Sequence, residues 1–272
     1  MDSKFLEFQL IDTNRVDLYD RKKYRTIDVH IWYLNVSKPC PIVIFSHALG
    51  EDINGKSYDL CPNISNQGYV VVSISHTYAC KPLTDCHPPY SIPLSGFHYN
   101  SIDKDPRNFY EIEIDVWIDD INIALVECLK RNDDTSNILY NKIDFTKIGI
   151  MGHSLGGSTA ISFRNTQFNI KAIINLDGPI FSKPDEINNN IPILIIIGSS
   201  KCETTIMLEE FDSMWRKIFD MYWLPDIEKF KKQNSNVTMV NIGFLSHKIF
   251  YLNMPNWILL EIINFLDTNL NH

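Results

Sequence analysis

Short, continuous apolar runs are the feature that most constrains how this chain folds. A strand buried on both faces has such a run, whereas a half-exposed strand alternates apolar and polar residues. The runs lie at residues 41–46, 69–75, 147–151, 171–176 and 192–197. They predict the inner strands of a parallel sheet.

Segments of helical character separate these runs. Residues 111–131 show the clearest case, since apolar side chains recur there at helical spacing. We expect further helices at residues 58–67, 156–164, 204–224 and 254–270, and a last strand at residues 237–242. Strands that alternate with helices predict an α/β fold, with a mostly parallel central sheet covered by helices on both faces.

The remaining segments complete the predicted domain. Residues 5–15 and 25–34 alternate apolar and polar side chains, which predicts two early antiparallel strands. We expect residues 1–272 to form a single domain. It carries an irregular insertion at about 77–110, rich in Pro, His, Tyr and Ser, and a helical excursion at about 204–233.

Composition narrows the classes of partner and the compartment. The net charge is −8 and no lysine- or arginine-rich run occurs, so we predict no nucleic-acid partner. Charges interrupt the N-terminal apolar residues, and no apolar run is long enough for a transmembrane helix. We therefore predict a cytoplasmic protein. Cys80 and Cys86 bracket a loop and form either a disulfide in an oxidising compartment or, as we favour, free thiols.

The glycine-rich stretch GHSLGG, at residues 152–157, carries the first chemical signal. Its Gly-x-Ser-x-Gly pattern stands between a predicted buried strand and a predicted helix, where it forms a tight turn called a nucleophile elbow. Gly152 and Gly156 lack Cβ atoms, which lets the strand and the helix approach closely around Ser154. We predict that Ser154 is a nucleophile; an ordinary structural turn is the alternative.

A serine nucleophile that attacks a carbonyl needs two backbone N–H donors for the oxyanion. Leu155 follows the serine directly and supplies the first donor in this prediction. The second comes from the loop SHALG after the first parallel strand, where we favour Leu49. His47, in the same loop, is expected to orient it rather than act as a base.

The base and its acid follow from chain order. His247 lies between the last predicted strand and the final helix, which matches the order nucleophile, acid, histidine. Asp177 comes directly after the apolar run at residues 171–176 and is our predicted acid. Glu203, after the next run, is the alternative.

These segments together resemble a known family. PIVIFSHALG, YVVVSISH, IGIMGHSLGG, NLDGPIF, NNNIPILIIIGSS and SHKIF occur in an order similar to that of the platelet-activating-factor acetylhydrolase family, over roughly residues 40–250. An acid placed after the strand that follows the nucleophile helix is the more specific feature, and Asp177 matches it. Ala48 departs from the glycine that is usual in such oxyanion loops.

The resemblance implies an α/β-hydrolase fold and a metal-independent serine esterase. Its expected substrates are small esters or phospholipids with short or oxidised acyl chains, cleaved through an acyl-enzyme on Ser154. A thioesterase, acyltransferase or peptidase using the same residues is the first alternative, and a non-catalytic binding protein is the second.

Two further expectations concern ligands. The sequence contains no cofactor motif and no metal-ligand spacing, so we predict neither. Aromatic residues of the two excursions are candidates for acyl-chain binding or peripheral membrane contact, with core packing as an equal alternative. They are Tyr78, Tyr90, Phe97, Tyr99, Trp215, Tyr222 and Trp223.

Overall fold

The computed structural model describes residues 2–17, 21–48, 59–77, 107–164, 167–181, 190–198, 223–243, 245, 247–250 and 254–271. The strands are β1 (Lys4–Val16), β2 (Tyr24–Tyr33), β3 (Cys40–Ser46), β4 (Val70–Ser75), β5 (Ile143–His153), β6 (Ile170–Leu176), β7 (Ile193–Ile197) and β8 (Val237–Asn241). The helices are α1 (Leu60–Ser65), α2 (Arg107–Asp133), α3 (Leu155–Ser162), α5 (Leu224–Gln233) and α6 (Asn256–Leu270), together with the 3-10 helix η5 (His247–Phe250).

The strands of the described residues form one eight-stranded sheet in the order β1-β2-β4-β3-β5-β6-β7-β8. β2 runs antiparallel to both β1 and β4, and every pair from β4 to β8 is parallel. The mostly parallel sheet and the two early antiparallel strands are therefore confirmed. Parallel strands end at the same edge, so the segments that follow β3, β5 and β6 lie near one another.

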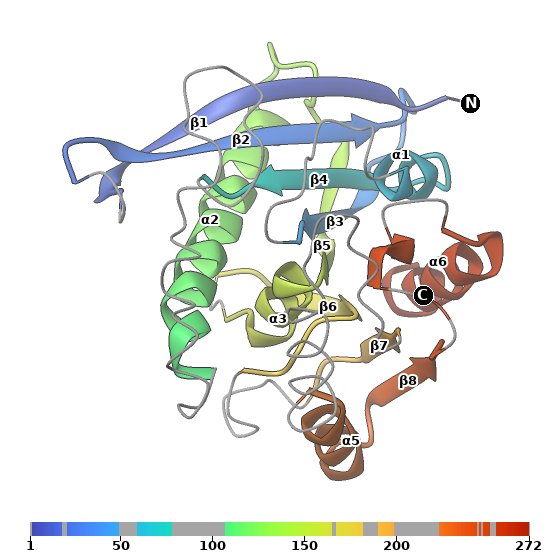
Figure 1. Ribbon diagram of the computed structural model, residues 1–272. Coiled ribbons are helices and arrows are strands. Elements are labelled where there is room, and N and C mark those ends of the chain that lie inside the picture. Colours follow the sequence, from blue (N-terminus) through green and yellow to red (C-terminus); the bar gives the residue numbers. More distant parts are fainter. Residues whose placement is uncertain are drawn as a thin grey trace.

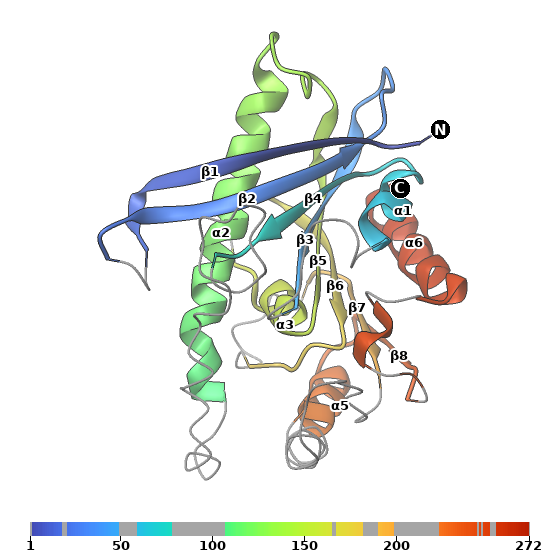
Figure 2. The same ribbon diagram turned by 45° about the horizontal axis from the view of Figure 1, so that its top comes forward.

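Helices cover both faces of this sheet, as predicted (Figure 1). β3 divides its side chains between the faces: Ile42 and Ile44 pack with α2, α3 and α5, whereas Val43 and Phe45 pack with α1 and α6. Figure 2 shows the same arrangement from a second direction, with α2 and α6 on opposite sides of β3 and β5. The continuous apolar runs are thus explained, because both faces of each inner strand are buried.

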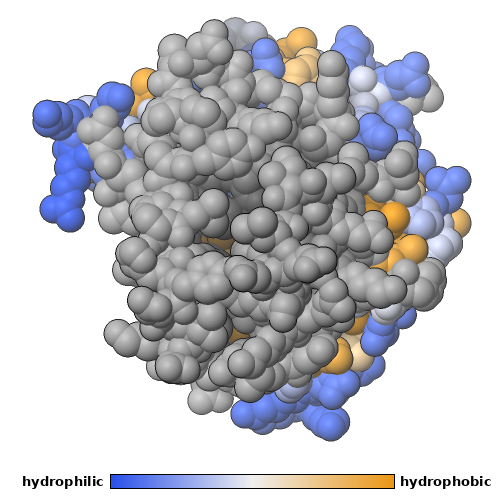
Figure 3. All heavy atoms as spheres, viewed as in Figure 1, coloured by the Kyte–Doolittle hydropathy of each residue, from blue (hydrophilic) through white to orange (hydrophobic). Residues whose placement is uncertain are grey.

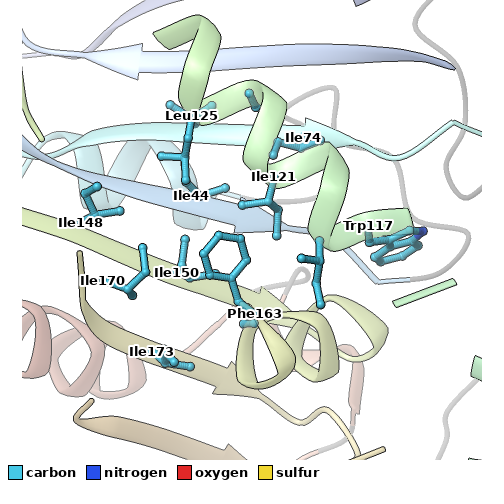
Figure 4. Packing of buried hydrophobic residues seen from close by; sticks show 14 of the residues in the cluster. Ile44, Ile74, Trp117, Ile121, Leu125, Ile148, Ile150, Phe163, Ile170 and Ile173 are labelled. Carbon is cyan, nitrogen blue, oxygen red and sulfur yellow. The ribbon is translucent and has the colours of Figure 1, made fainter. Parts of the chain in front are cut away.

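The long helix α2 is anchored to the sheet by its apolar side. Figure 4 shows Ile121 and Leu125 of α2 above Ile44 of β3 and Ile150 of β5. All four side chains are almost fully buried. Burial of one such side chain contributes about 1.5–3 kcal/mol, so α2 is held firmly where it passes the ends of the strands.

Two boundaries differ from the sequence-based expectation. α2 begins at Arg107, so residues 107–110 of the predicted irregular insertion are helical. Pro106 immediately precedes this helix, and proline is favoured at helix starts. β5 begins at Ile143 rather than Lys147, because Cys40 and Pro41 of β3 pair with Ile143 and Asp144 before a register shift. Within the helical excursion expected at about 204–233, α5 occupies Leu224–Gln233, whereas residues 204–222, which hold most of the helix expected at 204–224, lie outside the described residues.

The paired strands β1 and β2 extend beyond the body of the molecule at one end. The surface of this projecting end is mostly hydrophilic, as Figure 3 shows at its left side, although Val16 and Tyr24 are exposed there. In the part of the chain that the structure describes, no helix combines the length and apolar character needed to cross a membrane.

Candidate functional site

Ser154 occupies a strained backbone position between β5 and α3. Its φ is 54° and its ψ is −120°, which few residues other than glycine adopt. Among the described residues, the non-glycine positions with positive φ are Asn141, Ser154 and Asp177. Such strain costs of order 1–3 kcal/mol and is typical of functional sites. Two of the three strained positions are thus predicted site residues.

The glycines around Ser154 are required by close backbone packing. A Cβ on Gly152 would lie well inside contact distance of the Gly156 carbonyl. A Cβ on Gly156 would collide with the backbone carbonyls of Ser46 and His47, at the end of β3. The elbow therefore lies directly against the loop that follows β3.

Two backbone features place Ser154 and Leu155. The Ser154 N–H donates to the Leu176 carbonyl at 2.9 Å, which ties the elbow to the end of β6. Leu155 is buried and is the first residue of α3. The first N–H groups of a helix have no acceptor within the helix, and they carry its partial positive charge. Leu155 can therefore present a donor beside the half-buried Ser154.

Asp177 and His247 are joined by a short hydrogen bond. His247 Nδ1 lies 2.7 Å from Asp177 Oδ2. The other carboxylate oxygen accepts the Gly198 N–H at 2.9 Å. An ionised carboxylate can only accept, so the proton belongs on Nδ1 of His247 and Nε2 remains an acceptor. This is the tautomer that a general base needs.

The turn that carries Asp177 packs on the elbow. Asp177 has a φ of 53°, which aspartate tolerates better than most residues. Asn175 stabilises the turn with two hydrogen bonds to Gly178. Its Oδ1 accepts the Gly178 N–H at 2.7 Å, and its Nδ2 donates to the Gly178 carbonyl at 2.8 Å. A Cβ on Gly178 would collide with the Ser154 carbonyl. Asn175 was not predicted from the sequence as a site residue. The signal that could have indicated it is a polar residue within an otherwise apolar run.

His153, the last residue of β5, contacts His247 through a hydrogen bond and through its ring. Its Nε2 lies 3.0 Å from the His247 carbonyl oxygen, and the two ring centroids are 4.5 Å apart. Burial lowers the pKa of His153 well below its usual range, so the ring is neutral. A neutral ring with its proton on Nε2 donates to that carbonyl and fixes the segment that carries His247.

A comparison with solved structures identifies the fold that carries these residues. A ferulic acid esterase from Streptomyces cinnamoneus superposes with a TM-score of 0.61, covering 99% of this chain and 90% of its own, at 17% identity. The chain has the α/β-hydrolase fold.

Two sequence comparisons confirm the expected resemblance to platelet-activating-factor acetylhydrolases. The family described as platelet-activating factor acetylhydrolase, isoform II, matches residues 117–243, a range that contains Ser154 and Asp177. Platelet-activating factor acetylhydrolase of Gallus gallus is 25% identical over 240 residues, which cover 77% of this chain and 52% of that protein. The chain thus spans about half the length of this relative.

Within this α/β-hydrolase fold, the loop after β3 is partly described. Ala48 is buried, and its carbonyl oxygen lies 2.6 Å from His47 Nδ1. This contact agrees with the expectation that His47 orients the loop. Leu49, the predicted second oxyanion donor, and Glu203, the alternative acid, lie outside the described residues.

Trp223 is the one aromatic candidate for acyl or lipid contact that the structure describes. It is 2% exposed and meets the His247 ring edge-on at 5.8 Å. Its burial fits the alternative of core packing, and its ring packs against that of His247. The other aromatic candidates, Tyr78, Tyr90, Phe97, Tyr99, Trp215 and Tyr222, lie outside the described residues.

The remaining expectations concern cysteines and metals. Cys128 is fully buried, and burial raises the pKa of its thiol to about 12. Cys80 and Cys86 lie outside the described residues. Within the described ranges, no group of three His, Cys, Asp or Glu side chains is arranged to hold a metal ion.

Proposed function

We propose that this chain hydrolyses carboxylic esters through an acyl-enzyme on Ser154, with His247 as general base and acid and Asp177 as its orienting acid. The observation that carries the proposal is the 2.7 Å bond between His247 and Asp177, made at the sheet edge where Ser154 stands in its strained turn. The similarity to platelet-activating factor acetylhydrolases supports the same reaction class.

In the first step, Nε2 of His247 accepts the proton of the Ser154 hydroxyl as Oγ attacks the ester carbonyl carbon. The carbonyl oxygen becomes an oxyanion, for which we propose the backbone N–H groups of Leu155 and Leu49 as donors. One such donor contributes about 10²–10³-fold to kcat. The intermediate collapses, His247 returns the proton to the leaving oxygen, and the alcohol departs.

In the second step, His247 removes a proton from water, which attacks the acyl carbon of the Ser154 ester. As the second tetrahedral intermediate collapses, its bond to Ser154 Oγ breaks, His247 returns the proton to Oγ, and the carboxylic acid is released. Asp177 keeps its hydrogen bond to Nδ1 and stabilises the imidazolium that forms twice per turnover. Protein groups and water are enough for both steps.

We propose small or lipid esters with a short acyl group as the substrates. The support is the name of the chicken relative, which describes an acetylhydrolase of a platelet-activating factor. A series of p-nitrophenyl esters of increasing acyl length, extended by a thioester and a peptide, tests this choice. We expect kcat/KM to be highest for short oxygen esters.

Labelling with a fluorophosphonate probe tests the nucleophile directly. We expect the wild-type chain to be labelled at Ser154 and to hydrolyse p-nitrophenyl acetate, and Ser154→Ala to lose both. Ser158→Ala is the matched control, because Ser158 lies in the next turn of α3 and its hydroxyl donates to the Pro179 carbonyl. Undiminished hydrolysis by Ser154→Ala would overturn the proposal.

A further inference from the structure

A second serine, histidine and aspartate meet inside the molecule. Ser46 ends β3, His76 follows β4, and Asp120 lies in the middle of α2. Ser46 Oγ lies 2.8 Å from His76 Nε2, and His76 Nδ1 lies 3.0 Å from Asp120 Oδ2. All three side chains are completely buried. A substrate has no access to this Ser46, so the cluster is not a second catalytic centre.

The charge of Asp120 sets the direction of these hydrogen bonds. Arg25 donates to both of its carboxylate oxygens, at 2.6 and 3.1 Å, and Arg15 donates at 2.8 Å. Burial alone would raise the pKa of Asp120, but the positive charge of Arg25 and the bond from His76 hold it below its usual range. The ionised carboxylate only accepts, so His76 carries its proton on Nδ1 and accepts from Ser46 with Nε2.

The hydrogen bonds continue from His76 to His47, where donor and acceptor are again defined. The backbone N–H of His76 donates to His47 Nε2 at 3.1 Å, so this nitrogen carries no proton. Burial lowers the pKa of His47 to about 3, and the ring is therefore neutral with its proton on Nδ1. That proton is donated to the Ala48 carbonyl at 2.6 Å.

Trp117 of α2 prevents both rings from turning. Its ring stacks on His76 with centroids 4.0 Å apart and planes 5° from parallel, and it lies 5.3 Å from the His47 ring. Figure 4 shows Trp117 on α2, in the same packed layer as Ile121. Because the two histidine rings pack against Trp117, their hydrogen bonds keep fixed directions.

The segment that these bonds hold lies beside the nucleophile. The carbonyls of Ser46 and His47 press on Gly156, two residues after Ser154. A peptide unit is planar, so a hydrogen bond that fixes the Ala48 carbonyl also fixes the plane of the unit to which it belongs. The next residue in the sequence, Leu49, is the proposed second oxyanion donor.

We propose that Asp120, His76 and His47 are positioning residues, which act in series to orient the Ser46–Ala48 segment for stabilisation of the oxyanion. The proposal rests on the proposed function, since it assigns a role in the same reaction. These residues do not touch the substrate, and they act through the Ala48 peptide unit.

The test compares three changes at His47. His47→Phe keeps a ring against Trp117 but removes the donor to Ala48, and we expect kcat for p-nitrophenyl acetate to fall about 10- to 100-fold with KM changed less than about threefold. His47→Asn keeps a donor near the position of Nδ1, and we expect it to recover most of the lost kcat. His47→Gln keeps a polar group near the position of Nε2 only, and we expect it to resemble His47→Phe.

His30→Phe is the matched control, because His30 is equally buried but lies within β2, where it pairs with Ser73 of β4. We expect its kcat to stay within about twofold of wild type. If His47→Phe does not fold, Ser46→Ala removes the bond to His76 with less disturbance, and we expect a severalfold lower kcat.

The outcomes separate the two proposals. A wild-type chain that neither labels at Ser154 nor hydrolyses esters would overturn the proposed function and this inference with it. Labelled, active wild type together with unchanged kcat in folded His47→Phe or Ser46→Ala would overturn the inference alone. Equal losses of kcat in His47→Asn and His47→Phe would also overturn it, since a structural defect predicts no difference between them.

Discussion

His247 donates its Nδ1 proton to Asp177 across 2.7 Å, although the two residues are 70 positions apart in the sequence. The bond connects the end of β6 with η5. It leaves Nε2 as the acceptor on the ring, and His153 supports the same ring from the elbow. The packing of the folded chain therefore decides which ring nitrogen of His247 donates a hydrogen bond and which one accepts.

Replacing Asp177 with asparagine tests this assignment of donor and acceptor on the His247 ring. We expect Asp177→Asn to fold, because asparagine tolerates positive φ and its Oδ1 can accept the Gly198 N–H. Its Nδ2 would donate toward His247 and favour the wrong tautomer, so we expect kcat for p-nitrophenyl acetate to fall about 10³–10⁴-fold. Asp144→Asn, at the opposite end of β5, should change kcat less than twofold. Activity near wild type in Asp177→Asn would favour Glu203 as the acid.

The support that His153 gives to His247 predicts a smaller kinetic effect. His153→Phe keeps a ring beside His247 but loses the donor to the His247 carbonyl, and we expect kcat to fall about tenfold because the base is less well placed. His153→Gln retains an amide donor near the position of Nε2 and should lose less. Steady-state kinetics of the two variants, at matched thermal stability, makes the comparison. Equal kcat in both would mean that the donor has no role.

Close packing at the elbow predicts different costs for two glycine substitutions. Gly156→Ala drives a Cβ into the backbone of Ser46 and His47, which has little freedom to move. In Gly149→Ala the nearest atom is Leu270 Cδ1, at 3.3 Å, and a side chain can shift. We expect Gly156→Ala to lower the free energy of unfolding by roughly 3 kcal/mol or more, and Gly149→Ala by about 1 kcal/mol. Urea unfolding followed by tryptophan fluorescence would contradict this if the two costs were equal.

Three buried neutral histidines predict a loss of stability in mild acid. Burial lowers the pKa of His47, His76 and His153 in the folded chain, whereas the unfolded chain binds protons near the ordinary value of about 6.5. Below that pH the unfolded state therefore holds more protons, and stability falls as the pH decreases. His47 and His153, whose pKa values are lowered the most, each contribute roughly 1 kcal/mol per pH unit between about pH 6.5 and 5, and His76 acts in the same direction.

Urea midpoints measured between pH 7 and pH 5 at constant ionic strength test this dependence. We expect a steep decrease for the wild type, and a shallower one for His153→Gln, by about one proton. A flat stability profile over this range would contradict the prediction, because it would mean that the buried histidines take up protons as readily in the folded chain as in the unfolded chain.

Much of the fold was predictable because its signals are local. Continuous apolar runs such as residues 41–46 and 192–197 correspond to β3 and β7, since a strand buried on both faces needs them. The elbow was predictable for the same reason. Its glycines are required by contacts within a few residues of Ser154 and at one neighbouring strand end.

The extent of α2 and β5 was less predictable. The start of α2 at Arg107 lies outside the apolar pattern. The first residues of β5 are a strand because they pair with β3. Asn175 and Trp223 were also missed as supports of the site. The role of each depends on a partner, Gly178 or His247, that only the folded chain brings close.

By itself, the sequence determined which segments become strands, which serine occupies the strained turn, and which histidine follows the last strand. Only the tertiary structure decided that Ser46, His76 and Asp120 share one buried network, since they are 30 and 44 residues apart and follow no pattern. The physical reason is the strand order. β3 lies between β4 and β5, so the ends of these strands and the side of α2 meet at one edge of the sheet.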